Sequence, residues 1–177
     1  MHEIKMKVME FDRGDVRSFQ DFCEFIRKFV SDYLDSTEEF DMDPMQFFCC
    51  SSNAMYFINP LQFSEQDKIL NLLAVKKFCQ EHEIEYLGTI VTAEMRVVDL
   101  PAASSINLAM EYQRIKEFYE PFDIIWIECL DLKSRETKGF GWKIKEDGYE
   151  PYEISDVEMG RECNFYRIFL GDREALQ

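Results

Sequence analysis

Histidine, glycine and proline are scarce in this chain of 177 residues, which contains 2, 7 and 5 of them. Seven glycines leave little material for a phosphate-binding loop, and neither GxxxxGK[ST] nor GxGxxG occurs. The GxSxG pattern is also absent, and two histidines offer few bases to activate a serine or cysteine. The sequence therefore indicates no catalytic residue, and it favours a protein that is not an enzyme.

Metal-binding patterns are missing as well. None of the six cysteines forms a CxxC pair, so the spacing of a structural zinc site is absent. Most of these cysteines lie in apolar periodic segments, where a thiol behaves as a small hydrophobic group. We expect reduced thiols, no metal and no cofactor, and a cytoplasmic location.

Positive charge and long apolar runs are also in short supply. Lys plus Arg number 20 against 35 for Asp plus Glu, which gives a net charge of −15. A nucleic-acid binder needs a positive field, and so does a protein that docks on anionic lipid. Uninterrupted aliphatic or aromatic runs such as 124–127 are far shorter than the ~20 residues that span a bilayer. We therefore expect neither direct nucleic-acid binding nor a membrane protein.

What the chain does have is a large apolar content, with 46% hydrophobic and 15% aromatic residues. Such a composition can bury enough surface to offset the entropy lost on folding. A chain of this length buries roughly 70% of the surface that its unfolded form exposes. The prediction is a single globular domain over residues 1–177.

The first half of the chain has clear periodic patterns. Alternation over 3–9 predicts a strand, and apolar residues three and four apart predict a helix over 19–34 with Asp15 as its N-cap. Two short apolar segments, 46–50 and 54–58, predict a hairpin. A second helix is predicted from Ser64, with an apolar stripe made of Ile69, Leu72, Leu73, Lys76 and Cys79.

The second half is predicted to add a strand near 86–91, a third helix over 101–120 and further strands. The nearly continuous apolar run 122–132 is typical of a central strand buried on both faces. Segments 140–145 and 164–170 are expected to pair with the rest of the sheet. This order predicts an α+β fold, a mixed and mostly antiparallel sheet with about three helices packed on it.

Two acidic stretches stand out on the expected surface. From Phe29 to Asp67 there are eight acids and no Lys or Arg, and residues 146–162 hold seven acids against Arg161 alone. Aromatic residues alternate with the acids, among them Tyr33, Phe40, Phe47 and Phe48. Rings supply desolvated contact area and anions steer a cationic partner. The candidate partner-binding residues are Asp35, Glu38, Glu39, Asp41, Asp43, Tyr149, Glu150, Tyr152 and Glu153.

These features lead to a hypothesis of a small acidic protein-binding module with a basic protein partner. An inhibitor or immunity-type protein that engages a nucleic-acid enzyme or a toxin has this physical profile, by analogy of class alone. A mimic of DNA is a sharper version, made less attractive by the 20 interspersed basic residues. The alternative is a small enzyme or ligand-binding domain with an aromatic pocket around Glu128, formed with Trp126, Trp142 and Tyr56.

Overall fold

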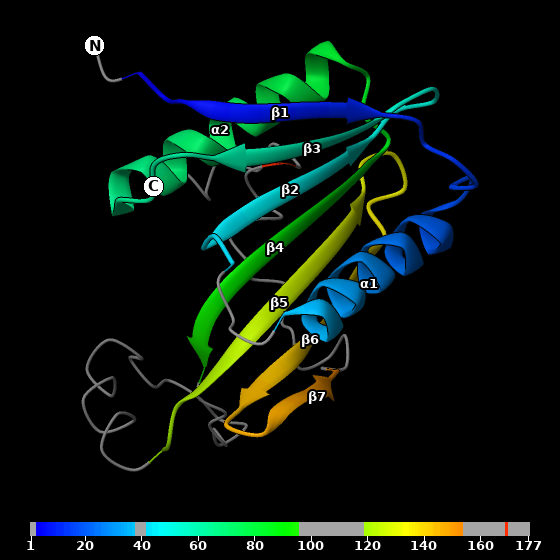
Figure 1. Cartoon of the computed structure of the whole chain (residues 1–177). Coiled ribbons are helices and arrows are strands. Elements are labelled where there is room, and N and C mark those ends of the chain that lie inside the picture. The colour runs from blue at the N-terminus through cyan, green and yellow to red at the C-terminus, as the bar shows by residue number, and fades with distance from the viewer. Residues whose placement is uncertain (1–2, 38–41, 96–118, 154–168, 170–177) are drawn as a thin grey trace, which may run out of the picture.

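The computed structural model describes residues 3–37, 42–95, 119–153 and 169. Within them the chain forms one seven-stranded sheet in the order β1-β3-β2-β4-β5-β6-β7, and every neighbouring pair is antiparallel (Figure 1). The elements are β1 Met6–Phe11, α1 Phe19–Ser36, β2 Met45–Cys50, β3 Met55–Pro60, α2 Glu65–Glu81, β4 Tyr86–Met95, β5 Phe122–Asp131, β6 Thr137–Lys145 and β7 Gly148–Tyr152.

Helix α1 forms because its apolar residues recur at helical spacing and Ser18 caps its first turn. The Ser18 hydroxyl accepts a 3.1 Å hydrogen bond from the backbone N–H of Asp21. The predicted cap at Asp15 is therefore wrong, because the helix begins at Phe19. The buried residues of α1 are Phe22, Cys23, Ile26, Val30 and Leu34, and they pack on one side of the sheet, which we call the α1 face.

Helix α2 begins at the predicted serine. The Ser64 hydroxyl accepts from the N–H of Asp67, and the Asp67 carboxylate accepts from the N–H of Ser64, which makes a reciprocal capping box. The predicted stripe is partly wrong, because Ile69 and Leu73 are exposed while Leu72, Val75 and Cys79 face the sheet. Apolar residues occur all around α2, so the pattern alone does not define which side is buried.

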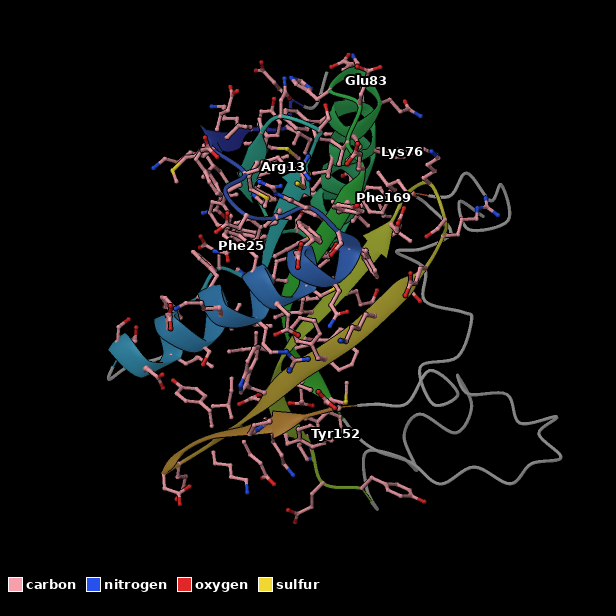
Figure 2. The ribbon with its side chains drawn as sticks, turned by 90° about the vertical axis from the view of Figure 1, so that its right-hand side faces the viewer. Arg13, Phe25, Lys76, Glu83, Tyr152 and Phe169 are labelled. Atoms are coloured by element: carbon pink, nitrogen blue, oxygen red, sulfur yellow. The ribbon has the colours of Figure 1, made fainter. Side chains whose placement is uncertain are left out.

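The two helices cover opposite faces of the sheet and are offset from each other. Figures 1 and 2 show α1 (blue) on one side and α2 (green) on the other. The core under α1 is built mainly on β2, β4, β5 and β6, through residues such as Phe48, Ile90, Ile127 and Phe140. The core under α2 joins Phe47, Ile58 and Leu87 to the helix. Central strands are therefore covered on both faces, whereas the edge strand β1 is largely exposed.

The predicted α+β class with an antiparallel sheet is confirmed, but the described residues hold two helices instead of about three. The predicted third helix, 101–120, lies almost entirely outside them. The predicted strand 164–170 also lies outside the described residues, except for Phe169. That residue has helical backbone geometry and packs against the core under α2. Strand β7 was not predicted, because Pro151 and acidic residues interrupt its apolar alternation.

In the part of the chain that the structure describes, neither helix has the length and apolar character needed to cross a membrane.

Candidate protein-binding interface

A group of phenylalanine rings lies where α1 meets the β1 side of the sheet. Phe25 and Phe29 of α1 pack on Phe48 of β2, with ring centres 5.5 and 4.9 Å away. Phe57 of β3 lies 4.9 Å from Phe48, and Phe11 of β1 lies 6.2 Å from Phe25. We call these five residues the phenylalanine cluster. Phe48 is buried at its centre, but Phe29 leaves 40% of its surface exposed to solvent.

The exposed side of this cluster continues onto the edge strand. Met9 of β1 is the cross-strand partner of Phe57, and it is 51% exposed. Because side chains alternate along a strand, Val8 points to the opposite face, where it is 46% exposed. Two consecutive residues of one edge strand therefore expose large apolar side chains, one on each face of the sheet. Exposed apolar groups gathered in this way mark interaction surfaces more often than isolated ones do.

Acidic side chains border the cluster. Asp43, just before β2, accepts a 2.7 Å hydrogen bond from the side-chain amide of Asn59, which follows Phe57 by two residues on the same face of β3. Asp32 lies one turn beyond Phe29 on α1, where Lys28 forms an exposed ion pair with it. Asp35 is exposed at the end of the same helix. We call Asp32, Asp35 and Asp43 the acidic rim.

The second group of predicted residues lies at the other end of the sheet. Strand β7 is the edge opposite β1, and Glu150 on it forms an ion pair with Lys145 of β6. That contact lowers the pKa of Glu150 and raises the pKa of Lys145. Glu153 lies 3.3 Å from Arg27 of α1. Glu150 and Glu153 are thus both paired with cations of the same chain, as Asp32 of the acidic rim is with Lys28.

The tyrosines of this group belong to packing contacts. Tyr149 is half-buried against the core under α1, and the Tyr152 ring lies 5.7 Å from that of Phe122. Figure 2 shows Phe25 and Tyr152 well apart on the molecule. Asp43 is held beside β3 by Asn59, and Asp35 is exposed at the end of α1. The group on and after β7 lies at the opposite edge of the sheet, where Glu153 contacts Arg27 of α1. Glu38, Glu39 and Asp41 lie outside the described residues.

For two of the aromatic residues that alternate with the acids, the prediction of an exposed position is wrong. Phe47 and Phe48 are almost fully buried, because β2 is covered by a helix on each face. The exposed apolar residues that sequence reasoning missed are Val8, Met9 and Phe29, which lie around the half-buried Phe57. The period-two pattern of β1 predicts a core position for Val8, and the helical stripe of α1 predicts one for Phe29. Met9 lies outside the predicted apolar face, and the placement of β1 at an edge leaves both faces of that strand exposed.

The four residues of the alternative pocket do not come together. Trp126 and Glu128 share one face of β5, where the indole N–H donates a 3.0 Å hydrogen bond to the half-buried Glu128 carboxylate. Trp142 lies on the other face, in the core under α1. Tyr56 lies on β3, packed against Phe78 of α2. The acid is thus held by its own neighbour on the strand, and the other two rings lie elsewhere.

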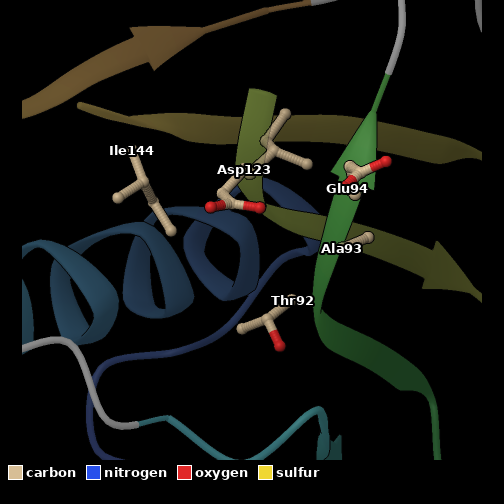
Figure 3. Close-up of a pocket in the computed structure, with 6 residues that line it drawn as sticks. Thr92, Ala93, Glu94, Asp123 and Ile144 are labelled. Carbon is tan, nitrogen blue, oxygen red and sulfur yellow. The ribbon is translucent and has the colours of Figure 1, made fainter. Parts of the chain in front are cut away.

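A shallow cavity of about 330 Å³ opens at the ends of β4 and β5 (Figure 3). Thr92, Glu94, Asp123 and Ile144 are among its lining residues, and Figure 3 shows the two carboxylates pointing in different directions. Across the described residues, no three His, Cys, Asp or Glu side chains gather as metal ligands would.

The described cysteines are free and buried. Burial raises the pKa of the Cys50 thiol to about 11. It also raises the pKa of Cys49, whose sulfur lies 3.9 Å from that of Cys79 on α2. Thiols held in the neutral form are poor nucleophiles, so Cys49 and Cys50 act as packing groups. Comparisons of this chain with protein-family models, with curated proteins and with solved structures give no match.

Proposed function

We propose that this chain is a small acidic protein-binding module that engages a basic protein partner through the phenylalanine cluster and the acidic rim. One observation carries the proposal: Phe29 and Met9 are exposed next to Phe57, Asp43 is held near Phe57 by Asn59, and Asp32 and Asp35 are exposed on α1 beyond Phe29. An apolar centre with a charged border is the usual anatomy of a protein–protein interface. A partner such as a basic nucleic-acid enzyme or toxin, which the module would inhibit, fits the net charge of −15.

The proposal differs from a simple solubility role in where the charge matters. If acids merely keep the protein soluble, neutralising any two of them has the same effect on binding. If the acidic rim contacts a partner, neutralising Asp35 and Asp43 weakens binding, whereas equal changes on α2 do not. Asp43→Asn keeps an oxygen that can accept from Asn59, so the local structure is retained.

The experiment compares two double variants with the same change in net charge. Asp35→Asn with Asp43→Asn removes rim charge, and Glu65→Gln with Glu81→Gln removes charge from α2. Each protein is used as bait at low ionic strength, and captured proteins are identified by mass spectrometry and then measured singly. A partner that binds the wild type and the α2 variant at least ten-fold more tightly than the rim variant supports the proposal. Equal binding by all three, or binding that does not weaken with salt, contradicts it.

A further inference from the structure

One edge of strand β1 is open, and the hydrogen bonds to β3 show which backbone N–H and C=O groups of β1 point to that edge. The N–H of Leu61 donates a 3.0 Å hydrogen bond to the carbonyl of Lys5, so Lys5 faces β3. In an antiparallel ladder the bonded positions recur every second residue. Lys7, Met9 and Phe11 therefore also bond to β3, and the backbone N–H and C=O groups of Met6, Val8 and Glu10 point away from it. Within the described residues, no strand pairs with that side of β1.

The two edges of the sheet differ in how well they are protected. Strand β7 has only five residues and contains Pro151, which has no N–H to offer to a further strand. Strand β1 has six residues, neither proline nor glycine, and an uninterrupted register with β3. Lys7 and Glu10 are the charged residues of β1, the kind of side chain that discourages edge pairing. The sheet is thus closed at β7 and able to accept a strand at β1.

The side chains of β1 indicate what kind of strand fits. On the α1 face, Met9 extends the row that runs through Phe57 to Phe48. On the other face, Val8 extends the row that runs through Ile58 to Phe47, and Glu10 places a carboxylate beside it. An added strand would continue these rows with apolar residues on the α1 face, and a basic residue would match Glu10 on the other.

We infer that an extended segment of the basic partner adds to the sheet along β1, as an eighth strand. The inference rests on the proposed function, which it deepens by naming the mode of recognition. The backbone bonds to Met6, Val8 and Glu10 supply affinity, and side chains beside Met9 and Glu10 supply selectivity. A second copy of this chain is a poorer occupant, because each copy carries a charge of −15 and repels the other.

The test uses a synthetic probe in place of the natural partner. One capped eight-residue peptide alternates valine and lysine, which gives an apolar row and a basic row. The control peptide has the same sequence, but the backbone nitrogens of its consecutive central residues are N-methylated. Because successive N–H groups point to opposite edges of a strand, this blocks the donors on both edges. The control peptide keeps charge and side chains but loses the donors that strand pairing needs. Binding to the full chain is measured by calorimetry at low and high salt.

We expect the unmodified peptide to bind at least ten-fold more tightly than the methylated one. We also expect the amides of Met6, Val8 and Glu10 to become protected from hydrogen exchange when the unmodified peptide is bound. Equal binding of the two peptides overturns strand addition, but leaves the acidic contact of the proposed function standing. Absence of binding by either peptide also overturns it. In a further outcome the unmodified peptide binds more tightly than the methylated one, but its affinity changes neither with salt nor between the wild type and the rim variant. That result retains strand addition and overturns the acidic contact.

Two proline variants of the chain provide a second test. Val8→Pro removes an N–H that points to the open edge, so the ladder with β3 is kept and the peptide is expected to bind at least ten-fold more weakly. Met9→Pro removes an N–H that bonds to β3 and is expected to lower the melting temperature more. Retention of full peptide binding by a folded Val8→Pro protein overturns the inference. A concentration-dependent dimer of the wild type with the same three amides protected also overturns it, in favour of a second copy.

Discussion

The guanidinium carbon of Arg27 lies 4.1 Å from the centre of the Phe140 ring, so this α1 side chain is stacked on β6. The same guanidinium reaches Glu153 beyond β7, at 3.3 Å. An arginine over an aromatic face gains from both cation–π attraction and packing of its stem. Arg27 therefore fastens the flank of α1 that faces away from β1.

This arrangement separates two contributions to stability. We expect Arg27→Ala to lower the free energy of unfolding by about 1–2 kcal/mol, since ring contact and stem packing are both lost. Glu153→Gln is expected to change it by less than about 0.5 kcal/mol, because exposed ion pairs contribute little. Urea denaturation measures both. Equal losses in the two variants would mean that the ion pair is the main contribution.

Glycines at two strand positions provide a matched comparison of crowding. A Cβ on Gly141 would lie 2.3 Å from the backbone oxygen of Ile125, which cannot move aside easily. A Cβ on Gly88 would lie 2.2 Å from Cδ1 of Ile26, the end of a flexible side chain. We expect Gly141→Ala to cost about 3 kcal/mol or more and Gly88→Ala about 1–2 kcal/mol. Denaturation midpoints in the reverse order would contradict the structure around β6.

The buried thiol of Cys50 makes the protein sensitive to alkali. Its pKa rises from 9.0 to about 11 on folding, chiefly through burial, so above pH 9 the unfolded state releases a proton that the folded state keeps. The free energy of unfolding therefore falls from pH 9 to pH 11, by up to roughly 2–3 kcal/mol from this group. Denaturation curves at pH 8, 9, 10 and 11 measure it.

The control for this effect is Cys50→Ala. Burial also raises the pKa of Tyr56 and Tyr86, and both tyrosines remain in the variant. The difference between the two pH profiles therefore isolates Cys50. Parallel profiles for the wild type and Cys50→Ala would show that the thiol is not the titrating group.

The two helix caps are expected to differ in strength. Ser64→Ala breaks a reciprocal box in which Asp67 is itself buried, and we expect it to cost about 1–2 kcal/mol. Ser18→Ala removes one hydrogen bond at an exposed end, and about 1 kcal/mol or less is expected. Thermal unfolding of the two variants compares them. A larger loss for Ser18→Ala would rule out this ranking.

Most of the sheet follows from local patterns in the sequence. The run at β5 is apolar on both faces and its residues on both faces are buried, and that pattern identifies a central strand without any structure. The cap at Ser64 is equally local, since it depends on residues three apart. The order of the strands does not follow from local patterns, because β1 pairs with β3 and not with β2, the next strand in the sequence.

The candidate interface depends on that non-local order. Val8 lies on the apolar face of the predicted strand, and it is exposed because β1 falls at an edge, as is Met9 on the other face. Asp43 has the signature of a solvated loop, and its hydrogen bond to Asn59 fixes it beside Phe57. The acidic half of the surface could be predicted from composition, whereas the apolar half required the positions of α1, β1 and β3 relative to one another.

The pairing of β1 with β3 also has a consequence for synthesis on the ribosome. Strand β1 is made before β3, its one partner among the described strands, so this pairing waits until Met55–Pro60 has left the exit tunnel. The hairpin of β2 and β3 is contiguous and can form as soon as both strands are outside. The nascent chain therefore leaves Met6–Phe11 without its β3 partner while α1 and the hairpin are being made, and during that time the segment is accessible to a chaperone.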